Sequence, residues 1–373
     1  MAAYRGKHRD AKPRKRRVAR TIAITMAVVL LAVATAGYAL YRHLDANIDH
    51  FDISAIPDRP EEVDTGPKKP VNILLLGSDT REGQKDVLGN TPGLSDTTIL
   101  LHLSADRKRA YGVSVPRDLM VERPDCKSKD GTSTVPGGWD QWNAAYSYGG
   151  PVCTIAQFEK MTDIKVNHAV VVDFNGFVSM VNALGGIEIC VPKEINDDIG
   201  KIYLPAGTYN MTGKQSLDYV RVRHTVPDMG DVGRMKRQQA FLAAMTNKAI
   251  SAGTLLNPVK LYNFLDAVTK SVTTDEELGS LTSMMGLANQ FKDIGLSKIK
   301  FLTMPITTYE PDPNRLAVGQ GADELWKALR HDKVLTKEQM SGAVKASNPS
   351  GKPGGKNQSE EDKRAAEIYN LCT

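Results

Sequence analysis

The segment Val71-Asn-Ile-Leu-Leu-Leu-Gly-Ser-Asp-Thr-Arg81 decides the fold. Its first six residues form the apolar run of a buried strand, and Asp79 and Arg81 follow that run directly. Two further strands are predicted at Thr97–Ser104 and Arg109–Val115, joined by a short polar turn. Because helical patterns and strand patterns are mixed along the rest of the chain, the sequence predicts an α/β layered domain.

Polar side chains are expected to meet at one end of the first three strands, if these strands are antiparallel neighbours. Asp79 and Arg81 follow the first strand, and Asp96 precedes the second. Arg117 follows the third. Carboxylates suit Mg²⁺, which completes its shell with phosphate oxygens and water, and guanidinium groups match phosphate bidentately. The strand ends therefore indicate a metal-assisted phosphate site, whereas a surface cluster of ion pairs is the alternative for any one pair.

Further basic residues lie in the second half of the chain. Arg221 and Arg223 alternate with valines, and a strand would place both arginines on one face. A long amphipathic helix is predicted over Gly233–Ile250, and Arg234 and Gln238 project from the same side of it. The N–H groups at a helix start also attract anions. These residues together predict a pyrophosphate site.

The first 20 residues contain nine lysines or arginines and one aspartate, although the whole chain has a net charge of only +5. Residues 21–41 contain no charged residue, and a helix of this length spans about 31 Å, the thickness of a bilayer core. We predict a basic cytoplasmic tail at 1–20, a transmembrane signal anchor at 21–41 and an extracytoplasmic stalk at 42–70. A cleaved signal peptide is the alternative, but its apolar run is shorter. Twenty cytoplasmic residues are too few for a helix-turn-helix, so no nucleic-acid partner is expected.

One large folded domain is predicted at 71–332, with its core motifs in 71–250. Within it, Tyr203–Met211 is interpreted as a hairpin around a Pro-Ala-Gly turn. A helix over Phe174–Leu184 presents an apolar face that suits either the core or the lining of a lipid tunnel. Residues 333–373 contain a run rich in Gly, Ser and Pro and are predicted to be a flexible C-terminal extension.

The four cysteines follow the predicted anchor and therefore lie in a compartment that permits disulfides. Cys126 and Cys153 flank a loop rich in Gly and Pro and are the favoured pair. Cys190 and Cys372 then either pair with each other or stay free, because four cysteines allow three connectivities.

The order of several short motifs resembles the LytR–CpsA–Psr family of cell-wall ligases over residues 70–250. Each motif alone is weak, and their succession makes the resemblance specific. The motifs are Asn72–Arg81, Ser95–Thr97, Val113–Asp118, Asn143–Gly150, Val172–Phe177, Leu184–Glu188, Ser216–His224, Gly233-Arg234 and Arg237-Gln238. One departure concerns the arginine that the family often has two residues before the second Asp, where this chain has Leu94.

The resemblance implies an α-β-α sandwich around a mixed, largely antiparallel central sheet. It implies Mg²⁺-assisted transfer of a phosphate-linked anionic glycopolymer from a polyprenyl pyrophosphate carrier to a peptidoglycan sugar hydroxyl. Asp79 and Asp96 would hold the metal, and catalysis would also use Arg117 and Asp231. The pyrophosphate would be bound by Arg81, Arg117, Arg221, Arg223, Arg234 and Gln238.

Asp231 is interpreted as the general base because it precedes Arg234 at the start of the long helix. Capping that helix or compensating its dipole is an equal alternative. Two other functions remain open: a pyrophosphatase that uses water as acceptor with the same residues, and a non-catalytic lipid-binding or regulatory membrane protein.

Overall fold

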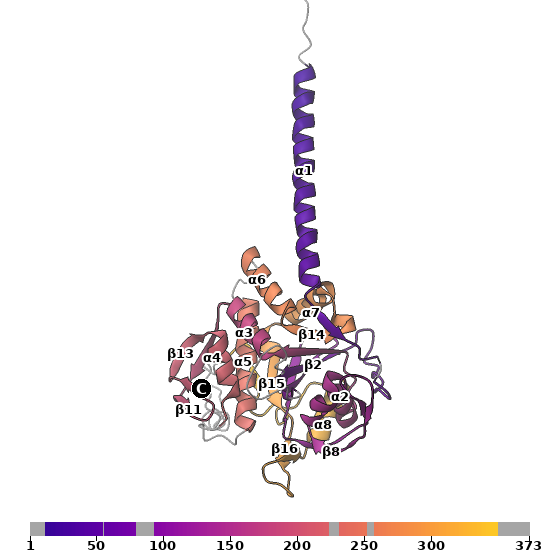
Figure 1. Ribbon diagram of the computed structural model, residues 1–373, viewed down its shortest axis with the longest axis vertical. Coiled ribbons are helices and arrows are strands. Elements are labelled where there is room, and N and C mark those ends of the chain that lie inside the picture. Colours follow the sequence, from indigo (N-terminus) through magenta and orange to yellow (C-terminus); the bar gives the residue numbers. More distant parts are fainter. Residues whose placement is uncertain (1–11, 55, 80–92, 224–230, 252–256, 350–373) are drawn as a thin grey trace, which may run out of the picture. The chain divides into compact units, whose positions relative to one another are not determined.

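The computed structural model describes residues 12–54, 56–79, 93–223, 231–251 and 257–349 (Figure 1). It divides into two units, Met1–Asn47 and Ile48–Thr373. The first unit contains helix α1 (Lys12–Asp45), within which Val18–Asp45 is long and apolar enough to cross a membrane. The predicted apolar segment 21–41 lies inside this helix, which is the one helix among the described residues with the length and composition of a membrane anchor.

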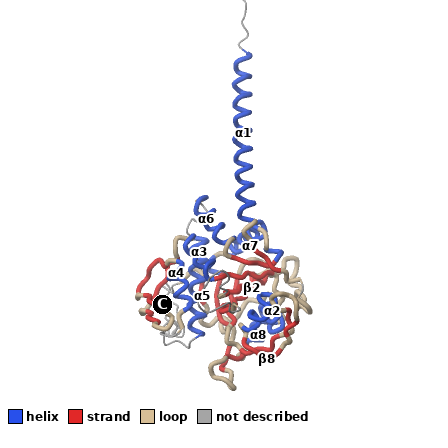
Figure 2. The backbone as a smooth tube through the Cα atoms, in the orientation of Figure 1, coloured by secondary structure: helices blue, strands red, loops and turns tan. Residues whose placement is uncertain are grey.

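The second unit is built on an eight-stranded mixed sheet with the strand order β1-β14-β9-β2-β3-β4-β15-β18. Figure 2 colours the strands red and the helices blue. At its centre, β2 is antiparallel to β3 and β3 to β4, whereas β9 and β15 flank them in parallel. The predicted antiparallel arrangement of the first three strands is therefore confirmed. The strands are β1 (Asp49–Phe51), β14 (Val272–Asp275), β9 (His168–Asp173), β2 (Val71–Ser78), β3 (Ser95–Leu103), β4 (Ala110–Val115), β15 (Ile299–Thr303) and β18 (Val344–Lys345).

Helices cover both faces of this sheet, because the apolar run of β2 supplies side chains to both sides. Leu74 and Leu76 pack with α2 and α8 on one face. Ile73 packs with α5 and α7 on the other. The result is the expected α-β-α sandwich. The helices are α2 (Ala144–Thr162), α8 (Ala322–Arg330), α5 (Asp231–Ser251) and α7 (Leu281–Ile294).

A second apolar cluster lies beside the sheet, under two strand pairs, and Val181 and Leu184 from the predicted helix 174–184 are buried in it. The predicted hairpin over Tyr203–Met211 is wrong, because β12 pairs with β11 and β13 pairs with β10. Each strand finds an apolar partner that precedes it in the chain. The elements are α3 (Phe174–Ala183), β10 (Ile187–Val191), β11 (Ile195–Asp197), β12 (Ile202–Leu204), β13 (Gly207–Met211), α4 (Gly213–Arg221) and α6 (Pro258–Thr269).

The folded unit is larger at its N-terminal side than predicted. β1 lies within the predicted stalk 42–70 and pairs in parallel with β14. Ile53 and Ile56 are buried in the main core, and Arg59 Nη2 lies 2.7 Å from Glu159 Oε1 of α2. The prediction of a stalk is wrong because a few well-placed apolar residues anchor a segment whose proline and charge content is typical of a linker.

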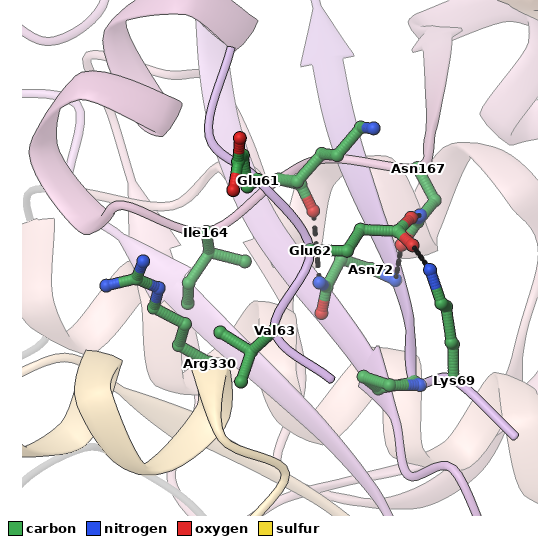
Figure 3. Close-up of a pocket in the computed structure, with 10 residues that line it drawn as sticks. Glu61, Glu62, Val63, Lys69, Asn72, Ile164, Asn167 and Arg330 are labelled. Carbon is green, nitrogen blue, oxygen red and sulfur yellow. Dashed lines mark hydrogen bonds and ion pairs between the residues drawn. The ribbon is translucent and has the colours of Figure 1, made fainter. Parts of the chain in front are cut away.

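The segment before β2 continues along the same domain and lines a crevice (Figure 3). The lining residues are Glu61, Glu62, Val63, Lys69, Pro70, Asn72, Ile164, Lys165, Asn167 and Arg330. Glu62 joins the two walls, since its carboxylate lies 2.6 Å from Lys69 Nζ and accepts a hydrogen bond of 2.9 Å from Asn167 Nδ2. These polar contacts hold the segment that precedes β2 against the domain.

The predicted flexible extension 333–373 is also partly wrong. Leu335 is buried in the main core, and β18 adds a strand to the sheet beside β15. Ala346 is buried as well. The folded domain therefore continues past residue 332 to the end of β18, and residues 350–373 lie outside the described part of the chain.

The predicted disulfide between Cys126 and Cys153 is present, and it joins β6 to α2 with a Cα–Cα distance of 5.4 Å. Cys190 lies in β10, and Cys372 lies outside the described residues, so their pairing stays a prediction. The remaining elements are β5 (Met120–Arg123), β6 (Cys126–Lys127), β7 (Thr134–Val135), β8 (Gly138–Gln141), β16 (Ile306–Thr308), β17 (Leu316–Val318) and two 3₁₀ turns at Glu276–Leu278 and Leu296–Lys298.

Candidate functional site

A β-bulge places Asp96 at the sheet edge. Gly77 pairs with Thr97 and Ser78 pairs with Ser95, so Asp96 is an extra residue in β3 without a partner in β2. A bulge of this kind redirects the side chain of the extra residue. Asp96 therefore faces the end of the sheet, where the predicted phosphate site lies.

Asp79 lies beside this bulge on the neighbouring strand. Its backbone N–H donates to the Leu94 carbonyl at 3.1 Å, and the Leu94 N–H donates to Asp79 Oδ1 at 2.6 Å. Leu94 thus contributes its backbone to the position of Asp79. Both predicted metal ligands lie at the same edge of the sheet.

Three arginines from distant segments converge on Asp96. Arg117, just after β4, has Nη1 at 2.9 Å from Asp96 Oδ1. Arg223, just after α4, donates from Nη2 to Asp96 Oδ2 at 3.1 Å. Arg234 of α5 donates from Nη2 to the Asp96 backbone carbonyl at 3.1 Å. The structure brings these three predicted arginines together around one carboxylate.

Asp231 closes the other side of this cluster from the first residue of α5. Its Oδ1 lies 2.6 Å from Arg234 Nη2 and 3.2 Å from Arg117 Nε. Both carboxylate oxygens are buried, and within the described residues neither accepts a hydrogen bond of good geometry. Asp231 is therefore a buried carboxylate held close to positive charge but poorly hydrogen-bonded.

The two carboxylates differ in their proton affinity. Burial raises the pKa of Asp231 above its ordinary value, and the nearby Arg234 and Arg117 do not fully offset this effect. Burial also acts to raise the pKa of Asp96, but the surrounding arginines outweigh it and hold that pKa below its ordinary value. The pKa of Arg234 is lowered to about 10 by burial, so its guanidinium stays charged at neutral pH. A pair of carboxylates with opposite shifts is typical of acid–base sites.

Arg221 does not lie where strand alternation placed it. Helix α4 begins at a capping box between Thr212 and Gln215 and continues through Arg221, so the predicted extended segment is wrong. The Arg221 guanidinium instead lies 4.6 Å from the centre of the Phe174 ring. Phe174 directly follows β9, whose last residue pairs with the end of β2. Arg221 therefore flanks the site on the β9 side and makes no described contact with Asp96.

Of the predicted pyrophosphate ligands Gln238 and Arg81, the structure describes only Gln238. Gln238 is buried and donates from Nε2 to the Val220 carbonyl at 3.3 Å, so it ties α5 to the end of α4. Arg81 lies outside the described residues. The assignment of both residues to pyrophosphate binding stays a prediction.

Sequence reasoning missed two residues at the edge of the cluster. Asp118 Oδ2 lies 3.2 Å from Arg117 Nε, and Arg315 Nη1 lies 3.3 Å from Asp118 Oδ1. Asp118 belongs to one of the quoted motifs, but that motif does not indicate its ion pairs with Arg117 and Arg315. Arg315 is far away in sequence and stands in no motif, so no local signal marks it.

A metal ion at this site would have two protein carboxylates available. The described part of the chain contains no group of three or more His, Cys, Asp or Glu side chains suited to a metal. Mg²⁺ usually takes only one or two carboxylates and completes its shell with substrate phosphate and water. Asp79 and Asp96 have the right chemistry for such an ion, but both oxygens of Asp96 already contact Arg117 and Arg223, so the magnesium site stays a prediction.

The family model described as the LytR_cpsA_psr family matches residues 40–333. This chain belongs to that family. Cell wall biosynthesis protein LcpA of Corynebacterium glutamicum is 28% identical over 327 residues, covering 79% of this chain and 61% of that protein. Polyisoprenyl-teichoic acid–peptidoglycan teichoic acid transferase TagV of Bacillus subtilis is 30% identical over 303 residues, covering 78% of this chain and 71% of that protein.

Among solved structures, TagT bound to LI-WTA aligns with a TM-score of 0.54 at 25% identity, covering 76% of this chain and 99% of that chain. The resemblance to the LytR–CpsA–Psr family and the α/β fold are thereby confirmed. The match spans less than two thirds of LcpA, so this chain corresponds to only part of that relative.

Proposed function

We propose that this protein transfers a phosphate-linked anionic glycopolymer from a polyprenyl pyrophosphate carrier to a sugar hydroxyl of peptidoglycan. The observation that carries this proposal is the convergence of Arg117, Arg223 and Arg234 on Asp96, with the buried Asp231 beside them. The family membership supports the reaction class, since the relative TagV is named a teichoic acid transferase.

The arginines would bind the pyrophosphate of the donor. Their charge is balanced by Asp96, Asp118 and Asp231 in the free protein, which keeps the guanidiniums in place before the ligand arrives. Because these side chains are largely buried, a diphosphate that enters the cluster meets oriented charge in a medium of low polarity. Arg221 would flank the same ligand from the β9 side.

The transfer forms one phosphorus–oxygen bond and breaks another. The acceptor hydroxyl attacks the phosphorus nearer the glycan, the bridging oxygen leaves with polyprenyl phosphate, and the hydroxyl proton passes to a base. Asp231 suits this base because its raised pKa increases the basicity of its carboxylate. Magnesium held by Asp79 and Asp96 would supply positive charge for the phosphoryl oxygens.

We also propose that the domain after α1 lies outside the cytoplasm. The basic residues before the apolar segment favour a cytoplasmic N-terminus. The Cys126–Cys153 disulfide supports the same orientation independently, because such bonds persist in oxidising compartments.

The test is transfer of a labelled glycopolymer from a polyprenyl-linked donor to peptidoglycan fragments by the full-length chain in detergent. Transfer should need Mg²⁺, should stop with a chelator and should fall at least 100-fold in Arg117→Ala. Arg330→Ala is the matched control, because Arg330 forms an ion pair with Asp163 instead of a cluster carboxylate. Glycan release that proceeds equally well without acceptor would instead favour a pyrophosphatase, and absence of both reactions would favour a lipid-binding protein.

A further inference from the structure

Trp139 of β8 and Tyr309 form a partly exposed aromatic pair. Trp139 is 59% exposed, and its Nε1 donates to Tyr309 Oη at 3.2 Å. The ring centres are 6.4 Å apart and the ring planes are inclined by 35°. The other two tryptophans, Trp142 and Trp326, are buried in the core. Trp139 and Tyr309, called the aromatic platform below, thus combine an exposed indole with a half-buried phenol ring.

The platform is connected to the cluster through β8. Residues two apart on a strand share a face, so Trp139 and Gln141 point to the same side. In one orientation of its amide, Gln141 donates from Nε2 to Asp118 Oδ1 at 3.5 Å, and in the swapped orientation its oxygen instead accepts from Arg315 Nε at 2.9 Å. Asp118 in turn contacts Arg117. The strand that carries Trp139 therefore also carries a side chain that contacts the Arg117–Asp118–Arg315 group.

The loop that carries Tyr309 is fixed to the same group. The Tyr309 N–H donates to the Arg315 carbonyl at 3.0 Å, and the Leu316 N–H donates to the Asp118 carbonyl at 3.1 Å. Figure 1 shows β8 and β16 together at one end of the domain. The platform therefore belongs to the site architecture and lies on its β4 side, whereas Arg221 and Phe174 lie on its β9 side.

The charges around the platform select the kind of ligand that can rest there. Asp140 adjoins Trp139, and Glu310 and Asp312 follow Tyr309 closely in the loop. The positive charge of Arg315 is balanced by Asp118 and Asp312. These carboxylates disfavour an anionic polymer and leave a neutral ligand unaffected.

We propose that the aromatic platform is a subsite for sugar rings of the acceptor glycan strand. This inference rests on the proposed function. A diphosphate donor can be held by ion pairing, whereas neutral sugar rings bind through stacking and hydrogen bonds. The C–H faces of sugar rings pack on aromatic rings, and indole and phenol groups combine an apolar face with a polar edge. An exposed surface also lets a long polymer pass over the site.

The first experiment uses Trp139 as a reporter. Acrylamide quenching is measured on the full-length chain, in a detergent without a sugar headgroup, with peptidoglycan glycan fragments added. Because Trp142 and Trp326 are buried, the quenchable emission comes from Trp139, and the fragments should reduce it. Trp139→Phe should lose this signal. Protection by an anionic glycopolymer in place of the peptidoglycan fragments would overturn the assignment to the acceptor, and protection by neither would overturn the subsite.

The second experiment separates the subsite from the catalytic centre. Trp139→Ala and Tyr309→Ala should each raise the KM for acceptor about tenfold, with kcat and the KM for donor nearly unchanged. Trp139→Phe should retain most of the acceptor affinity, and Tyr203→Ala, an exposed tyrosine on β12, is the matched control. Unchanged acceptor KM in active variants would overturn the subsite alone, whereas a wild-type chain without transfer would overturn the proposed function.

Discussion

The bulge at Asp96 and the start of α5 at Asp231 contact two of the same arginines, but their carboxyl groups have opposite pKa shifts. Asp96 accepts hydrogen bonds from Arg117 and Arg223, which stabilise its ionised form. Asp231 lies equally close to guanidinium nitrogens without a well-oriented hydrogen bond among the described residues, so burial dominates. At Asp96 the charges of Arg234 and Arg117, with the hydrogen bond from Arg117, outweigh burial and lower the pKa. At Asp231 burial, with the nearby charge of Asp118, outweighs the arginines and raises the pKa.

The largest expected effect comes from removing the charge of Asp96. Asp96→Asn should lower transfer about 10³-fold, because the arginines lose the carboxylate that orients them and the metal loses a ligand. Initial rates at saturating donor and acceptor measure this effect. A decrease of less than tenfold would mean that the arginines are positioned without Asp96, and Arg330→Ala controls for the loss of an ion pair elsewhere.

The next effect concerns Asp231 as a base. Asp231→Asn should lower kcat about 10²-fold and leave the KM for donor nearly unchanged. In the wild type, activity should fall as the pH drops through the raised pKa of Asp231, because the protonated carboxyl cannot accept the hydroxyl proton. The pH profile of kcat measures this fall in activity at low pH, which should disappear in Asp231→Asn. If the variant still loses activity at low pH, Asp231 acts in helix capping and not as the base.

How much of this cluster could be predicted depended on distance along the chain. Asp79, Asp96 and Arg117 were placed correctly because strand direction follows from local apolar runs. The Arg221 prediction failed because alternating valines imitate a strand, whereas the Thr212 capping box starts a helix that continues past them. Arg315 reaches Asp118 across 197 residues, and no local pattern encodes such a contact.

A smaller effect is expected on the free energy of unfolding, where the Asp96 and Asp231 variants should again differ in direction. At neutral pH, Asp96→Asn should lower the free energy of unfolding by about 2 kcal/mol, because hydrogen bonds to a charged group are lost. Asp231→Asn should change it in the opposite direction, because a buried carboxylate with a raised pKa opposes folding when ionised. Thermal unfolding of the full-length chain in detergent measures both changes.

The stability contributions of Asp96 and Asp231 should depend on pH in opposite ways. The contribution of Asp96, with a lowered pKa, is complete above the unfolded value of about 3.9 and is lost as the pH falls through the folded value. Asp231, with a raised pKa, contributes favourably only below about 3.9 and loses that contribution as the pH rises through its folded value. Equal shifts for both variants across this range would show that the two carboxylates share one environment.

The smallest expected effect comes from Arg221, which lies on the side of the site next to β9. Arg221→Ala should raise the KM for donor by about two- to fivefold, because an exposed guanidinium over an aromatic ring contributes only ~1 kcal/mol. Arg221→Lys should retain part of this affinity, since the charge remains while the stacking on Phe174 weakens. The acceptor KM should not change in either variant, because the aromatic platform lies on the opposite flank of the site. A change in acceptor KM alone would mean that the two flanks exchange their roles, with the donor extending over β8 and the acceptor over α4.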